Sequence, residues 1–170
     1  MKHSGKLIVL VSGLLAFSTN MFAYTGTGSL AVSATVQGSC TIGGGTLAFG
    51  AYDPTSNTDL QVNTPIALTC ANGASVTLSL GAGANAVAGI RELKSTTKTG
   101  SFLTYGVYSD SNASVAWGDG TAATGSAATV VYSGTGSSSP INVYGKIAAH
   151  QSTAVASNDY MDTIVITASF

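Results

Sequence analysis

The sequence predicts an all-β fold, an antiparallel β-sandwich of the immunoglobulin-like type, and three observations support this prediction. Short runs in which apolar and polar residues alternate recur along the chain, without a sustained apolar pattern of 3.6-residue period. Gly, Asn, Asp and Pro separate these runs, as turns separate the short strands of a sandwich. Hydrophobic residues make up 45% of the chain and charged residues only 8%, which is a composition opposite to that of disordered chains.

Residues 1–23 are predicted to be a secretion signal. Two lysines form a basic start, and the apolar run of residues 7–17 follows them. This run is too short to cross a bilayer, which requires about 20 residues. Cleavage is expected after Ala23, with cleavage after Ser18 as the alternative. The rest of the chain has the length of one domain, and we expect it in an extracytoplasmic compartment.

The first strand-like run follows the signal directly. Side chains alternate in direction along a strand, so four small or apolar residues share one face of this run: Leu30, Val32, Ala34 and Val36. That face must be covered by something. The alternation alone leaves open whether the strand joins a sheet of its own chain or a sheet of another molecule.

Further strands are expected in order along the chain. A short run at residues 47–50 and a turn at Pro54 come first, and residues 59–62 follow. The next two runs place apolar side chains on one face each: Ile66, Leu68 and Cys70, then Val76, Leu78 and Leu80. Residues 81–94 are predicted to be a long surface connection or a mobile loop, because their first part is small and flexible.

The second half of the chain continues the pattern. Its next runs are Leu103, Tyr105 and Val107 on one face with Phe102 and Tyr108 opposite, then residues 128–133, then Ile141, Val143 and Ile147. The final run aligns Ile164, Ile166, Ala168 and Phe170, with Val165 on the other face. Because chain termini normally fray, we expect this last strand to be held by other structure.

The two cysteines, Cys40 and Cys70, are expected to form a disulfide, because an exported chain meets an oxidising compartment. The chain-entropy model assigns such a loop a stabilisation of about 3 to 4 kcal/mol. The competing interpretation, a metal-binding or catalytic thiol, requires partners. Outside the predicted signal, His150 is the only histidine, and it is expected to be a surface residue.

The sequence offers no constellation of catalytic residues. A hydrolase needs a nucleophile with a base or a positioned carboxylate pair, whereas the acidic residues are scattered and are expected to form turns: Asp53, Asp59, Glu92, Asp110, Asp119, Asp159 and Asp162. The glycine-rich runs lack the ending of a phosphate-binding loop. With six basic and seven acidic residues, the chain is not expected to bind nucleic acid. We therefore expect no enzyme activity, no cofactor and no metal site.

Two features keep alternatives open. Trp117 could stack on a sugar together with nearby tyrosines, although a core aromatic is the more ordinary role of such a residue. Asn112, Ala113 and Ser114 match the acceptor sequence for N-glycosylation, which matters only in a host that has the machinery.

Six runs occur in an order that resembles a known family: GSCTIGGGTLAFGAYDPTS, IALTC, GIRELK, LTYGVYSD with WGDG, INVYGKI and DYMDTIVITASF. They resemble the spore coat U domain, the subunit family of archaic chaperone–usher pili. The resemblance covers essentially all of residues 24–170. It implies an incomplete immunoglobulin-like sandwich that lacks its last strand, in which Cys40 and Cys70 form the intradomain disulfide.

The resemblance also implies roles for the two ends of the chain. Residues 24–38 would be an N-terminal donor-strand extension, and residues 39–170 the pilin domain. Leu30, Val32, Ala34 and Val36 would enter the groove of a neighbouring subunit, with Ala34 small for its pocket. Ile164, Ile166, Ala168 and Phe170 would form the C-terminal strand that faces a periplasmic chaperone.

The function implied is that of a structural subunit of a secreted pilus, of the major rod type, that supports adhesion and biofilm formation. Its partners would be a periplasmic chaperone, an outer-membrane usher and neighbouring copies of itself or related subunits, without membrane insertion. The chain would pass through the periplasm to the cell surface. The alternative is a monomeric cell-surface coat protein or glycan-binding β-sandwich module, and a secreted hydrolase ranks last.

Overall fold

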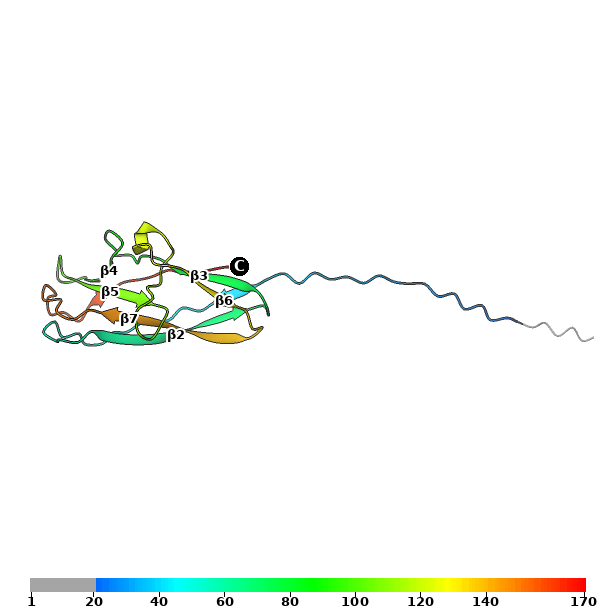
Figure 1. Cartoon of the computed structure of the whole chain (residues 1–170), viewed down its shortest axis with the longest axis horizontal. Helices are drawn as coiled ribbons and strands as arrows, with labels where there is room; N and C mark the ends of the chain where they lie inside the picture. The colour runs from blue at the N-terminus through cyan, green and yellow to red at the C-terminus, as the bar shows by residue number, and fades with distance from the viewer. Residues whose placement is uncertain (1–20) are drawn as a thin grey trace, which may run out of the picture. The chain divides into compact units, whose positions relative to one another are not determined.

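The computed structural model describes residues 21–170, which fall into two units, residues 21–35 and residues 36–170. Residues 1–20, most of the predicted signal, lie outside the described part. Figure 1 draws residues 21–35 as an extended trace without helix or strand. Within this trace Leu30 is 88% exposed and Val32 is 86% exposed. The apolar face predicted for this run is therefore uncovered.

Residues 36–170 form an all-β unit with one short 3-10 helix, η1 (Ala122–Thr124). Its strands are β1 (Cys40–Ile42), β2 (Leu60–Cys70), β3 (Ser75–Leu80), β4 (Arg91–Ser95), β5 (Phe102–Tyr108), β6 (Val130–Ser133), β7 (Ser138–Ile147), β8 (Tyr160–Met161) and β9 (Ile166–Ser169). They build two antiparallel sheets, one with the order β1-β2-β7-β5-β4-β8 and one with the order β6-β3-β9. This arrangement confirms the predicted immunoglobulin-like β-sandwich class (Figure 1).

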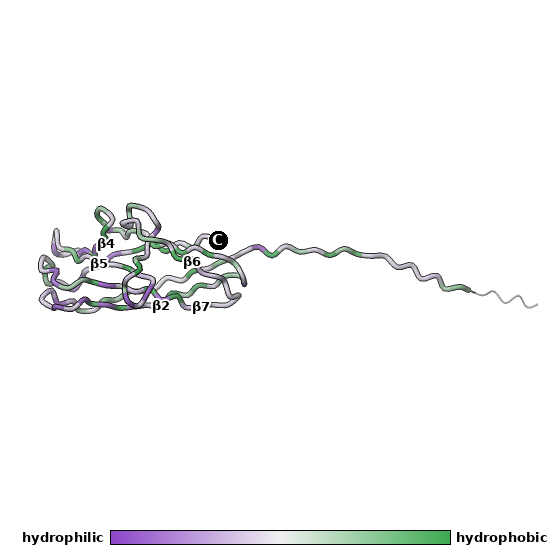
Figure 2. The backbone as a smooth tube through the Cα atoms, in the orientation of Figure 1, coloured by the Kyte–Doolittle hydropathy of each residue, from purple (hydrophilic) through white to green (hydrophobic). Residues whose placement is uncertain are grey.

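The longest pairing joins β2 to β7, from Leu60 opposite Ile147 to Thr69 opposite Ser138. β2 continues straight through Pro65, although the sequence suggested two separate runs there. Figure 2 shows hydrophobic and hydrophilic residues interspersed along the strands, as expected when each strand has one buried face. Every strand face predicted from alternation in β2, β3, β5 and β7 is buried: Ile66, Leu68, Cys70, Val76, Leu78, Leu80, Leu103, Tyr105, Val107, Ile141, Val143 and Ile147.

Trp117 lies at the centre of this core with an exposed fraction of 0%. Its indole Nε1 donates a hydrogen bond of 3.1 Å to the carbonyl oxygen of Leu78, so the ring links the β5–β6 connection to the smaller sheet. The ring of Tyr132 packs 6.4 Å away, centroid to centroid. The interpretation of Trp117 as a core aromatic is thus confirmed, and the residue is not accessible to a sugar.

Two sequence-based expectations about elements are wrong. Residues 91–95 were expected in a surface connection but form β4, in which Arg91 is only 6% exposed. Its guanidinium donates to the carbonyl oxygens of Leu80 and Gly81, and those bonds replace the water that a charged side chain normally needs. Residues 47–50 were expected as a strand, but they are irregular because no neighbouring strand pairs with them.

The predicted disulfide is present. Cys40 and Cys70 are directly opposite each other in the antiparallel pair of β1 and β2, and their sulfur atoms are bonded. Cys70 is buried in the core, whereas Cys40 is half-buried at the start of the first strand. The crosslink therefore fixes the point at which the N-terminal extension joins the sandwich.

The prediction that acidic residues form turns is confirmed for three of them, Asp53, Asp110 and Asp119. Asp53 accepts hydrogen bonds from Thr55, and Asp110 accepts them from Ser114 and Val115. Asp159 was also predicted to form a turn, but it accepts from the backbone of Thr96 and Thr97, more than 60 residues away, and so links two distant segments. Asp119 accepts from the hydroxyl groups of Thr121 and Thr124, which lowers the pKa of its carboxyl to about 2. The carboxylates of Asp53, Asp110 and Asp119 are thus engaged in their own turns.

Removing the disulfide should destabilise the sandwich without changing its fold. We expect the double replacement Cys40→Ser and Cys70→Ser to lower the free energy of unfolding by about 3 to 4 kcal/mol, because the unfolded chain regains the entropy of an open loop. Urea denaturation measures the change. Reduction of the native chain should give the same loss, and an unchanged midpoint in either case would contradict the structural role of the crosslink.

Asp119 should titrate near pH 2 and depend on its threonine partners. The Thr124 hydroxyl contributes most to the lowered pKa, so Thr124→Val should raise the pKa toward 3.8. Since the folded pKa is the lower one, this contact stabilises the fold above pH 3.8 and the stabilisation is lost as the pH falls through about 2. NMR titration of the carboxyl carbon measures both values. Thr129→Val is the control, because Thr129 makes no hydrogen bond to Asp119 in the described chain, and it should leave the titration unchanged.

Candidate functional site

A cavity of about 320 Å³ opens between the two sheets of the sandwich. Its lining is mainly apolar and comes from both sheets and from the irregular residues after β1: Leu47, Phe49, Ile66, Leu80, Ile164 and Ile166. We call this cavity the groove. It lies beside the core, and the aromatic ring of Phe49 meets that of Tyr105 edge-on at 5.9 Å within it.

One wall of the groove is the last strand with the residues just before it. β9 pairs with β3 on one side and is the outermost strand of its sheet. The carbonyl oxygens of Thr163 and Val165 accept hydrogen bonds from Ala84 and Gly81, on the β3 side. Successive backbone groups point to opposite sides of an extended chain. The amide and carbonyl groups of Ile164, Ile166 and Ala168 therefore face the outer edge, where the described chain provides no strand.

The opposite wall is formed by residues 45–49. β1 ends at Ile42, and one further bond from the Gly43 amide to the Ala67 carbonyl continues its contact with β2. Beyond it the chain carries Leu47 and Phe49 over the larger sheet, where both side chains are half-buried against Gly145. The groove is therefore bordered by a free strand edge on one side and by irregular backbone on the other.

One end of the groove is polar. Asp162 lines it and accepts hydrogen bonds from the Tyr105 hydroxyl at 2.7 Å, the Thr163 amide at 2.8 Å and the Asn85 amide at 3.1 Å. Burial raises the pKa of the Tyr105 phenol, and the bond to Asp162 raises it further, so the phenol remains a donor. Burial also lowers the pKa of nearby Arg91. The groove thus combines an apolar floor with a fixed carboxylate at one end.

The predicted site residues are divided between the two units. Ile164 and Ile166 line the groove, as a C-terminal strand bordering a gap would require. Ala168 packs against the core instead, and Phe170 is 63% exposed. Leu30, Val32, Ala34 and Val36 are all exposed and belong to no strand of the described chain.

Sequence analysis missed the residues that complete the groove. Tyr105 was predicted only as a core residue and Asp162 only as a turn former, whereas together they form its polar end. Leu47 and Phe49 carried a usable signal, since they alternate with small residues directly after the first strand. The signal was interpreted as an ordinary strand because alternation does not reveal a missing partner.

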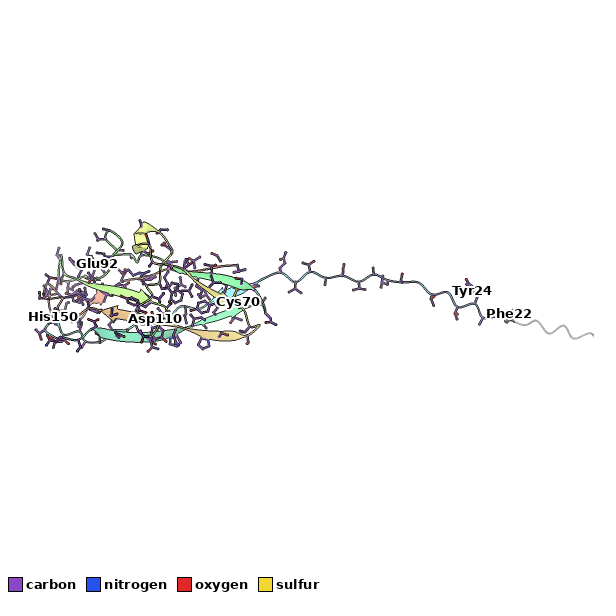
Figure 3. All side chains as sticks on the ribbon, in the orientation of Figure 1. Phe22, Tyr24, Cys70, Glu92, Asp110 and His150 are labelled. Atoms are coloured by element: carbon purple, nitrogen blue, oxygen red, sulfur yellow. A yellow bond between two sulfur atoms is a disulfide. The ribbon has the colours of Figure 1, made fainter. Side chains whose placement is uncertain are left out.

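Residues 21–170 contain no cluster of three His, Cys, Asp or Glu side chains able to hold a metal ion. No helix within them is long and apolar enough to span a membrane. His150, labelled in Figure 3, is exposed as expected.

Comparisons with known proteins give a consistent result. The family model described as "Spore Coat Protein U domain" matches residues 26–167. Protein U of Myxococcus xanthus is 33% identical over 178 residues, a match that covers 96% of this chain and 94% of that protein. A chaperone–tip adhesion subunit pre-assembly complex from the archaic chaperone–usher Csu pili of Acinetobacter baumannii contains a similar structure, with a TM-score of 0.54 and 19% identity. That match covers 80% of this chain and 40% of the solved chain, and it shows the fold alone.

The Tyr105 hydroxyl should stabilise the polar end of the groove. Tyr105→Phe removes a hydrogen bond to a carboxylate, and we expect the free energy of unfolding to fall by about 1.5 to 3 kcal/mol. Tyr108→Phe is the matched control, because the Tyr108 hydroxyl has no hydrogen-bond partner in the described chain, and it should change stability by less than about 0.5 kcal/mol. Thermal unfolding measures both variants. Equal effects of the two would contradict the role assigned to Tyr105.

Proposed function

Because the chain belongs to the spore coat protein U domain family, we propose that it is a structural subunit of a secreted surface pilus assembled by donor-strand complementation. The observation that carries the proposal is the groove, an apolar cavity that lies beside the free edge of β9. A strand added at this edge would pair with the backbone of residues 164–168 and place alternate side chains in the cavity. Addition of an extended peptide to a sheet edge is a known mode of recognition.

Residues 24–38 have the properties that such a strand needs. Their apolar side chains stand on one face at a spacing of two residues, and those of Leu30, Val32 and Val36 are 86% to 90% exposed. Burial of each of these side chains would contribute about 1.5 to 3 kcal/mol to the free energy of strand binding. The entropic cost of ordering the extension offsets part of this gain. Ala34 contributes little because it is small. In this proposal the extension of one copy fills the groove of the next, while residues 39–170 form the pilin domain.

Before assembly the groove requires a temporary occupant. An open strand edge beside apolar surface promotes aggregation, so we infer that a periplasmic chaperone lends a strand there. Ile164, Ile166, Ala168 and Phe170 would face this chaperone, and an outer-membrane usher would exchange it for the next subunit. The similar Csu subunit is described in a complex with a chaperone, which supports this step. The fibre would serve adhesion and biofilm formation at the cell surface.

The alternative, a monomeric coat or glycan-binding module, receives less support from the site. A stable monomer would leave the edge of β9 and the groove open to water. The aromatic side chain proposed to stack on sugar, Trp117, is enclosed by the core. A module of this kind also gives no reason for an extension with one exposed apolar face. We therefore favour the role of a polymerising structural subunit over that of an enzyme or a lectin.

The donor-strand proposal is tested by placing one charge on either face of the extension. Val32→Lys should abolish polymer formation, because loss of Val burial and desolvation of the ammonium weaken strand binding by more than about 1000-fold. Ser33→Lys carries the same charge one residue later on the opposite face, and fibres should still form. Electron microscopy and heat-resistant ladders on denaturing gels measure assembly. The proposal fails if both variants polymerise, or if neither does.

Deletion of residues 24–38 distinguishes capture of the groove by a chaperone from its use in polymerisation. The truncated chain should still be captured by a periplasmic chaperone as a soluble 1:1 complex, because the groove is unchanged. It should not polymerise, because it has no strand to lend. Fibres formed by the truncated chain would contradict the assignment of the donor. A stable, soluble and solitary truncated monomer would favour the alternative module.

A further inference from the structure

The loop that follows β5 presents one asparagine at its tip. The Ala113 amide donates a hydrogen bond of 3.1 Å to the Asp110 carbonyl, which closes a four-residue turn with Ser111 and Asn112 at its two central positions. The Asn112 side chain is exposed and makes no hydrogen bond within the described chain. Figure 3 labels Asp110, the residue that begins this turn.

The base of the turn is firmly fixed. The Asp110 carboxylate accepts bonds from the Ser114 amide at 3.0 Å, the Ser114 hydroxyl at 2.8 Å and the Val115 amide at 2.7 Å. The Ala113 side chain is only 6% exposed, so it is packed against the protein. Its backbone adopts a φ of 50°. Asn112 is thus held outward on a rigid support, and none of the contacts that hold the turn uses its side-chain amide.

We propose that Asn112 is the acceptor of an N-linked oligosaccharide. Asn112, Ala113 and Ser114 are the only match to the acceptor sequence N-x-S/T in the whole chain. Such acceptors belong to the surface loops of exported proteins, and the turn supplies that context. The site needs only an exported chain and is independent of donor-strand assembly.

The donor substrate belongs to the class of oligosaccharides carried on a polyprenyl diphosphate. The Asn112 amide nitrogen forms a bond to the anomeric carbon of the first sugar, while the bond from that carbon to the phosphate oxygen breaks. Polyprenyl diphosphate leaves with the bonding electron pair, and the amide nitrogen loses one proton to a base of the transferase. The reaction consumes no oxidant or reductant.

The position of Asn112 is compatible with the rest of the molecule. The residue is neither part of the groove lining nor part of a strand, so a bulky sugar there leaves β9 and its free edge accessible. The folded turn, however, engages the Ser114 hydroxyl with Asp110, and this is the hydroxyl that the acceptor sequence requires. Transfer is therefore expected on the exported chain before the turn closes, and the experiment uses protein made by the producing organism.

The test is the mass of the intact protein isolated from the surface of its producing organism. The chain should be heavier than its mature polypeptide by one oligosaccharide, and tandem mass spectrometry should place the addition on Asn112. Asn112→Gln should lose the addition completely. Asn142→Gln is the matched control, because Asn142 is also exposed but lies in β7 outside any acceptor sequence, and it should keep the addition.

Variants at Ser114 distinguish transfer from a general effect on the loop. Ser114→Ala should lose the addition, whereas Ser114→Thr, which keeps the hydroxyl required by the acceptor sequence, should retain it. A wild-type chain with the mass of the bare polypeptide would overturn the proposal. So would an addition that persists in Asn112→Gln, since this would place the sugar on one of the many serines or threonines.

Discussion

The site depends on one strand edge, the outer edge of β9, which lies beside an apolar groove and pairs with no strand of the described chain. The core beside it is well packed, with Trp117 fully enclosed and the long pair of β2 and β7 inside the larger sheet. At the edge of β9, backbone groups and apolar side chains of the same residues, Ile164 and Ile166, both face the gap. A single added strand can supply hydrogen-bond partners for these backbone groups and cover these apolar side chains at the same time.

The other features of the chain are arranged around this position. The disulfide joins β1 to β2 and so holds the residues that form the second wall of the groove. The hydrogen bond from Tyr105 to Asp162 fixes the polar end, and Arg91 binds the backbone carbonyl oxygens of Leu80 and Gly81. The carboxylates of Asp53 and Asp119 stabilise turns, and that of Asp159 links its own segment to the backbone of Thr96 and Thr97.

Sequence reasoning succeeded where a strand has one buried face and one exposed face. The alternation in β2, β3, β5 and β7 gave the correct inward side chains, because each of these strands lies between water and a common core. It failed for residues 91–94 of β4, because the burial of Arg91 depends on carbonyl groups of Leu80 and Gly81 that are brought near only by folding. It also failed for residues 47–50, whose alternation is genuine but whose pairing partner is missing.

The sequence by itself determined the all-β class, the pairing of two cysteines, the turn-forming carboxylates and an extension with one apolar face. Each of these follows from local residue spacing or from composition. Only the tertiary structure decided that Trp117 is a core residue, that Tyr105 and Asp162 meet, and that a groove lies beside a free strand edge. Those features join residues far apart in the chain, and a gap in a sheet is defined by the neighbours around it.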